Sequence, residues 1–112
     1  MRFGGFVDTL PPHIQMKDPY LELLKEKVLA GMIGEKVRIF VFGSRARNNY
    51  HRTSDIDIGL IPAGKLDRKK AAFLKEEIEN LNIPYKVDIV DFSDVSEHFK
   101  QEALKDIIVW KD

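Results

Sequence analysis

With 112 residues, the chain has the length of one domain, and its hydrophobic fraction of 44% excludes a disordered protein. Its 18 basic and 18 acidic side chains cancel to a formal net charge of +0, which counts against binding of long nucleic acid, since that affinity comes largely from neutralised phosphates. The absence of cysteine excludes disulfides and thiolate metal sites.

Residues 1–17 form an irregular segment with two glycines and the run Leu10-Pro11-Pro12. Such a segment predicts an N-terminal arm, followed by one domain over residues 18–112. The N-terminus lacks the apolar core of a signal peptide, and no apolar run reaches the length of a membrane span. We therefore expect a cytoplasmic protein without a membrane partner.

Two regular elements are predicted directly after the arm. Apolar side chains recur at helical spacing from residue 18 to about residue 30, with Asp18 as the expected N-cap and Pro19 as the first helical residue. Residues 37–42 are almost all β-branched or aromatic and end at Gly43, which predicts a strand buried on both faces.

The later part of the chain interleaves strands with helices. We expect strands over residues 55–61, 85–90 and 107–110, and helices over residues 67–81 and 94–105. Asp94 and Glu97 have the spacing of a capping box at the start of the last helix. The polar stretch 44–54 is expected to hold a short helix, which would make the first connection a crossover. This order predicts an α/β (α+β) fold, a small mixed β-sheet flanked by helices.

Two aspartates interrupt the second predicted strand. Alternate strand residues share a face, so Asp55 and Asp57 would lie about 6.6–6.8 Å apart at their Cα atoms, with Ile56 and Ile58 pointing into the core. Paired carboxylates repel each other unless a cation lies between them, and Mg²⁺ is bound in this way, through one or two carboxylates plus substrate phosphates. The alternative is a pair of solvated residues on an exposed sheet face, although aspartate is disfavoured in strands.

A third acid, Asp88, lies between Val87 and Ile89 in the third predicted strand. If that strand neighbours the one with Asp55, the carboxylates can converge. Asp91 is the rival candidate, but it belongs to a turn-like stretch in which aspartate is ordinary. We select Asp88.

The turn after the first strand reads Gly43-Ser44-Arg45. Gly43 lets the backbone approach a ligand closely, and Ser44 is a suitable N-cap for a short helix that begins at Arg45. A helix N-terminus suits phosphate, and a nearby guanidinium such as that of Arg45 would strengthen the site. The alternatives are a tight turn with no ligand and a solvated loop arginine.

The chain resembles the minimal nucleotidyltransferase (MNT) family of the polymerase-β superfamily in two motifs, Val41-Phe42-Gly43-Ser44-Arg45-Ala46-Arg47 and Ser54-Asp55-Ile56-Asp57-Ile58. The resemblance covers about residues 20–110, and Val87-Asp88-Ile89-Val90 matches the segment with the third acid. Asn48 departs from it, because many relatives have glycine there.

The resemblance implies a polymerase-β-like fold and an enzyme that transfers a nucleoside monophosphate from a nucleoside triphosphate, with ATP and AMP as the expected pair. It also implies that Asp55 and Asp57 hold two Mg²⁺ ions. Asp88 would complete one metal site and help to activate the acceptor hydroxyl, while Gly43 and Ser44 would hold the triphosphate.

The size of the chain favours a protein or small-molecule hydroxyl or a short nucleic-acid end as acceptor, because template-dependent polymerases need further domains. Families of this kind are often encoded beside a small helical HEPN protein, which the nucleotidyltransferase modifies with AMP as an antitoxin. The resemblance permits this role. The alternative is a non-catalytic module that binds a nucleotide or masks a partner. The oligomeric state stays open.

Overall fold

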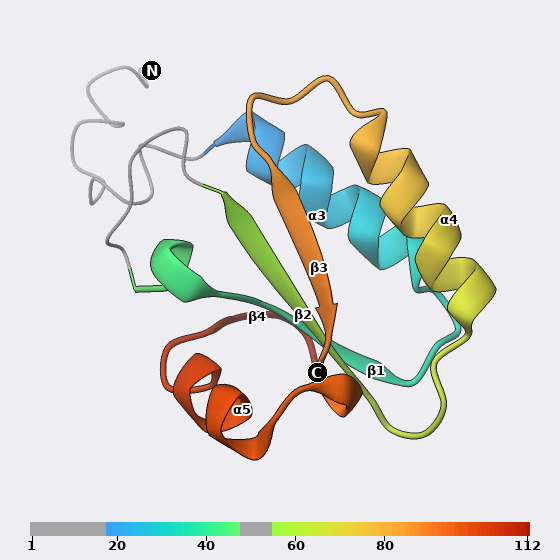
Figure 1. The fold of residues 1–112 in the computed structure, drawn as a ribbon. Helices are drawn as coiled ribbons and strands as arrows, with labels where there is room; N and C mark the ends of the chain where they lie inside the picture. The colour runs from blue at the N-terminus through green and yellow to red at the C-terminus, as the bar shows by residue number, and fades with distance from the viewer. Residues whose placement is uncertain (1–17, 48–54) are drawn as a thin grey trace, which may run out of the picture.

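The computed structural model describes residues 18–47 and 55–112. In these residues the helices and strands follow the predicted order (Figure 1). The elements are α3 (Pro19–Gly31), β1 (Val37–Phe42), the 3₁₀ turn η1 (Gly43–Arg45), β2 (Ile56–Pro62), α4 (Arg68–Glu79), β3 (Val87–Asp91), the 3₁₀ turn η2 (Phe92–Asp94), α5 (Glu97–Ala103) and β4 (Ile108–Lys111). The predicted arm, residues 1–17, lies outside the described residues. Within the described ranges, every helix is too short or too polar to cross a membrane.

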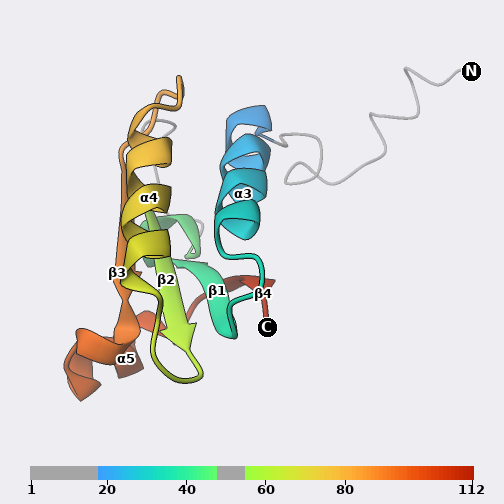
Figure 2. The ribbon, with the colours of Figure 1, turned by 90° about the vertical axis from the view of Figure 1, so that its right-hand side faces the viewer.

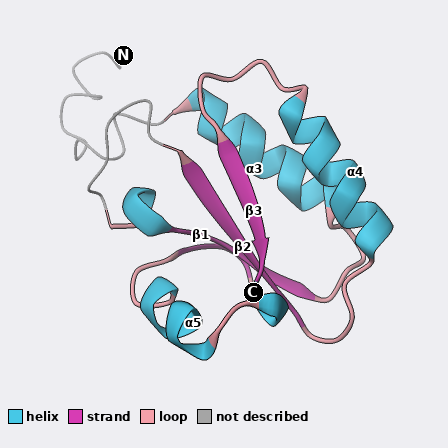
Figure 3. Ribbon diagram, in the orientation of Figure 1, coloured by secondary structure: helices cyan, strands magenta, loops and turns pink. Residues whose placement is uncertain are grey.

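The four strands form one mixed sheet in the order β3-β2-β1-β4. β2 and β3 are parallel, whereas β1 is antiparallel to both of its neighbours, β2 and β4. The mixed sheet flanked by helices is therefore confirmed (Figure 3). The predicted crossover between the first two strands is wrong, because antiparallel neighbours need only a connection that reverses direction. The helical crossover joins β2 to β3 instead, through α4.

Hydrophobic side chains pack on both faces of this sheet. On one face α3 and α4 run side by side (Figure 2) and cover an aliphatic core that includes Leu24, Val28, Ile58 and Leu74. On the other face a phenylalanine cluster, Phe40, Phe42 and Phe92, packs against α5 and its flanking residues. Successive strand residues point to opposite faces, so β1, which is apolar except for Arg38, contributes side chains to both cores.

Room for the phenylalanine cluster depends on Gly59 in β2. A Cβ atom at this position would lie 2.4 Å from the Phe40 ring and 2.8 Å from the ring of Phe92. The two rings pack edge to face, with centroids 5.1 Å apart, a preferred arrangement for aromatic pairs.

Side-chain caps set where the helices begin. Asp18 accepts a hydrogen bond from the Tyr20 N–H at 2.9 Å, which confirms it as the cap of α3. At α5 the predicted capping box is wrong: the cap is Ser96, which accepts from the Phe99 N–H at 3.1 Å. Asp94 is not available as the cap because it belongs to η2, and the helix starts only after that turn.

Candidate active site

Two of the three predicted acids face each other across the parallel strand pair. Asp57 of β2 and Asp88 of β3 are register partners. Phe42, the last residue of β1, pairs with Asp57 from the other side. Asp57 therefore occupies the middle of three neighbouring strands, at the point where β1 ends. The condition set by the sequence, that the third strand lies beside the second, is met by the parallel pairing of β2 with β3.

Asp55 lies just outside the strand in which it was predicted. β2 begins at Ile56, whose N–H donates to the carbonyl oxygen of Lys86 at 2.9 Å. Asp55 is exposed, as is Asp88, whereas Asp57 is partly buried. Ile56 and Ile58 are fully buried, as the alternation predicted.

Asp57 lies in an environment that disfavours its negative charge. Burial raises the pKa of the Asp57 carboxyl above its ordinary value, and the negative charges of Asp88 and Asp55 raise it further. The positive charge of Arg47 acts in the opposite direction. Like charges placed this close disfavour ionisation unless a cation offsets them. The site therefore has excess negative charge around Asp57.

Gly43 brings the backbone of η1 into contact with the Asp57 carboxylate. A Cβ atom at this position would lie 2.5 Å from Asp57 Oδ2, and the φ angle of +78° is one that side chains disfavour. The N–H groups of Ala46 and Arg47 donate to the Gly43 carbonyl oxygen at 3.1 and 3.2 Å. Glycine is thus needed here for both space and conformation.

Ser44 does not cap a helix as predicted. The short helical turn begins at Gly43, not at Arg45, and the position before it is Phe42, which makes no side-chain capping bond. The reason is that the left-handed Gly43 turns the chain directly out of β1, which places Ser44 inside the turn.

The two arginines that follow Gly43, Arg45 and Arg47, have different surroundings. Arg45 is buried, with its guanidinium carbon 4.5 Å from the centroid of the Tyr85 ring. Arg47 is exposed, and it is the arginine whose charge acts on Asp57. Sequence reasoning missed Tyr85, because a tyrosine before a strand has no pattern that marks it as an arginine partner. The predicted contact of Arg45 with a nucleotide stays a prediction.

A divalent cation fits this site in its donor chemistry. In residues 18–47 and 55–112, no group of three acidic, histidine or cysteine side chains is arranged to hold a metal ion. Mg²⁺ does not need such a cage, because it is commonly bound through one or two carboxylates together with phosphates and water. The paired oxygen donors Asp57 and Asp88, together with the repulsion at Asp57, match that requirement.

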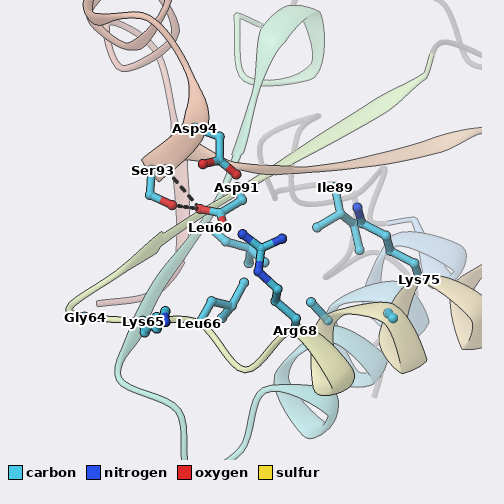
Figure 4. A pocket seen from close by; sticks show the side chains of 12 residues that line it. Leu60, Gly64, Lys65, Leu66, Arg68, Lys75, Ile89, Asp91, Ser93 and Asp94 are labelled. Carbon is cyan, nitrogen blue, oxygen red and sulfur yellow. Dashed lines mark hydrogen bonds between the residues drawn. The ribbon is translucent and has the colours of Figure 1, made fainter.

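A pocket of about 450 Å³ lies away from these acids (Figure 4). Leu60, Ile89 and Asp91, which help to line it, lie on the sheet face under α4, whereas Asp57 and Asp88 alternate to the opposite face. Asp91, the rival acid, accepts hydrogen bonds from Ser93. The structure thus separates Asp91 from the paired acids.

Comparison with known proteins identifies the family of this chain. The family described as polymerase beta nucleotidyltransferase matches residues 33–112. A Haemophilus influenzae protein described as the probable protein adenylyltransferase MntA is 28% identical over 88 residues, which are 79% of this chain and 77% of the relative.

Solved structures of similar fold come from toxin–antitoxin systems. A toxin–antitoxin crystal structure with AMP-PNP matches with 26% identity and a TM-score of 0.59, over 77% of this chain and 71% of that chain. A Shewanella oneidensis MNT antitoxin in complex with tri-AMPylated HEPN toxin matches with 24% identity and a TM-score of 0.51, over 80% and 70% of the two chains, which supports the fold. The chain belongs to the polymerase beta nucleotidyltransferase family and is a homologue of the minimal nucleotidyltransferase MntA.

Proposed function

We propose that this nucleotidyltransferase moves AMP from ATP onto a hydroxyl group of a partner protein. The observation that carries the proposal is the position of Asp57, which pairs with Asp88 across the β2–β3 ladder and contacts the Gly43 turn. The acids and the Gly43 turn therefore lie together at one end of these strands, where a triphosphate can bind between them.

The reaction exchanges one bond at phosphorus for another. The acceptor oxygen forms a bond to the α-phosphorus of ATP, and the bond from that phosphorus to the α,β-bridging oxygen breaks, so pyrophosphate leaves. The hydroxyl proton passes to the carboxylate of Asp88, which is exposed and can meet an incoming acceptor. Gly43 leaves space for the triphosphate beside Asp57, and Ser44 supplies a hydroxyl donor.

Two Mg²⁺ ions, held by Asp55, Asp57 and Asp88, would supply positive charge that stabilises the attacking and leaving oxygens. The pKa of Asp57 is raised by burial first and by repulsion from Asp88 and Asp55 second, and the repulsive part is what bound cations would relieve.

The relatives indicate the class of partner. MntA of Haemophilus influenzae is described as a probable protein adenylyltransferase, and the 26% identical structure is a toxin–antitoxin complex. We extend this to the present chain: its acceptor is a small helical HEPN-type toxin, and AMP transfer makes this chain the antitoxin of the pair. The reaction would take place in the cytoplasm, where ATP is made.

Labelled ATP tests the proposal directly. The protein, Mg²⁺ and a lysate of the source organism are incubated with ATP labelled on the α- or the γ-phosphate. We expect label in a protein band from the α position only, and its loss with Asp57→Asn. The matched control is Asp91→Asn, which changes an aspartate of the neighbouring strand β3 on the opposite face of the sheet and should retain transfer.

Three outcomes count against the proposal, two against AMP transfer and one against the role of Asp57. Label from the γ position would indicate a kinase-type reaction. Transfer by Asp57→Asn would remove that residue from the chemistry. ATP binding with no label from either position, in a lysate shown to contain a HEPN-type protein, would favour the non-catalytic nucleotide-binding or partner-masking module.

A further inference from the structure

Arg45 is the one charged side chain that is buried among the described residues, with 7% of its surface exposed. A buried guanidinium is costly unless nearby groups compensate its charge. Its position in η1, two residues after Gly43, raises the question of what the burial achieves.

The aromatic ring of Tyr85 is one group that stabilises this charge. The Arg45 guanidinium lies 4.5 Å from the ring centroid, within the range of a cation–π interaction. The Tyr85 hydroxyl donates to Asp18 Oδ2, so the ring has a cation on its face and an anion at its hydroxyl. Tyr20 packs edge-on against the same ring, with centroids 6.3 Å apart.

Asp18 extends this chain of contacts to the first helix. Its other oxygen, Oδ1, accepts from the N–H groups of Tyr20 and Leu21 at 2.9 and 3.4 Å, and so caps α3. Arg45, Tyr85 and Asp18 therefore link η1 to the start of α3. Because α3 is packed against the aliphatic core through Leu24 and Val28, the link ends on a rigid part of the fold.

Tyr85 is also close in sequence to Asp88. Tyr85 is followed by Lys86, which accepts the hydrogen bond from the Ile56 N–H, and then by the strand with Asp88. The turn with Gly43 and the start of β3 are thus held by one stack. Glycine at a positive φ has many accessible conformations, so an external contact is needed to keep its carbonyl and Ser44 in one place beside Asp57.

We propose that Arg45 is a positioning residue, which acts through Tyr85 to hold the Gly43–Ser44 turn against Asp57. This inference rests on the proposed AMP transfer for its kinetic consequence, but the anchoring itself is a property of the protein without substrate.

Two tyrosine variants separate the ring from the hydroxyl. Tyr85→Phe keeps the ring under Arg45 and removes the hydroxyl with its bond to Asp18, so kcat should fall by less than about 3-fold while thermal stability decreases slightly, as expected for the loss of one hydroxyl's hydrogen bonding. Tyr85→Leu removes the stack, and kcat should fall about 10- to 100-fold, because small misplacements of reacting groups cost rates of that order. Equal kcat losses in the two variants would overturn the proposal.

A double-mutant cycle identifies the partner of Arg45. Arg45→Met should lower kcat as much as Tyr85→Leu, with a smaller effect on KM for ATP. The double variant should be no worse than either single variant by more than about 2-fold, because both remove one contact. If the losses multiply, or if Arg45→Met raises KM and leaves kcat intact, Arg45 contacts the nucleotide itself. Arg68→Met, on an exposed arginine of α4, controls for the loss of charge.

Hydrogen exchange tests the anchoring without catalysis. The amides of Ala46 and Arg47, which donate to Gly43, should exchange at least about 10-fold faster in Arg45→Met and in Tyr85→Leu than in wild type, because local opening sets their protection. The β1 amides should keep their protection, which verifies that both variants are folded. Unchanged exchange at Ala46 and Arg47 would refute the anchor. Inactive wild type with faster exchange in the variants would refute only the proposed AMP transfer.

Discussion

The two faces of the sheet are covered very differently. One carries α3 and α4, of 13 and 12 residues, over an aliphatic core. The other carries the phenylalanine cluster and α5, which has 7 residues, none of them buried. The smaller cover leaves the ends of β2 and β3 open on this face, where Asp57 and Asp88 lie. The face under α3 and α4, the closed face, supports the fold. The face under α5, the open face, is incompletely covered and provides space for a substrate.

Truncation of Phe92 is the strongest test of whether the open face contains a real core. Phe92 is 3% exposed and packs on both Phe40 and Phe42. Phe92→Ala should lower the free energy of unfolding by about 3–5 kcal/mol, as measured by urea denaturation. Ile33→Ala is the control, since Ile33 is 75% exposed, and should change it by less than about 0.5 kcal/mol. A cost below about 1 kcal/mol for Phe92→Ala would show that the closed face alone holds the fold.

Substitution of Gly43 tests how tightly the open face is built around Asp57. Gly43→Ala combines a positive φ with a contact to the Asp57 carboxylate, so it should destabilise by about 1–2 kcal/mol and also lower AMP transfer. Thermal unfolding and the labelled-ATP assay measure the two effects. Gly64→Ala is the matched control, because nothing lies within 4 Å of its Cβ position, and it should be neutral or stabilising. Equal stability of the two variants would mean that the turn tolerates a side chain.

Substitutions at the N-terminus of α5 test which residue starts the helix that covers the open face. Ser96→Ala removes the bond to the Phe99 N–H and should cost about 1 kcal/mol in thermal unfolding. Asp94→Ala removes the residue expected from the capping-box spacing and should stay within about 0.5 kcal/mol of wild type, because Asp94 does not cap this helix. The reverse ranking of the two variants would restore the capping box.

The smallest expected effect concerns the charge at Asp57. Its pKa is raised in the folded protein, by burial and by Asp88 and Asp55, so the folded state favours the protonated form. Stability from this group is therefore present at low pH and is lost as the pH rises through its titration. Asp57→Asn should unfold at a higher temperature than wild type at neutral pH in the absence of Mg²⁺.

The difference between wild type and Asp57→Asn should shrink as the pH falls through the titration of Asp57. Added Mg²⁺ should stabilise wild type more than the variant, because a bound ligand favours the state that binds it. If the variant is less stable than wild type at neutral pH without metal, the repulsion between the acids does not govern this site.

Local chemistry determined much of this protein. Asp18 and Pro19 specified the start of α3, and alternation placed Ile56 and Ile58 in the core, because caps and side-chain periodicity act over a few residues. The same reasoning singled out Asp57 and Asp88, since an acid is unusual in an apolar strand, and Gly43, since glycine lets a backbone approach a ligand closely.

Only the tertiary structure decided how these parts meet. The antiparallel pairing of β1 with β2, the register of Asp57 with Asp88, and the stack of Arg45 on Tyr85 join segments that are far apart in the chain. Asp94 was the cap expected from the sequence, but it is taken up in η2, and Ser96 caps α5 instead. A local pattern states what a residue can do, whereas its partner depends on which distant segments pack together.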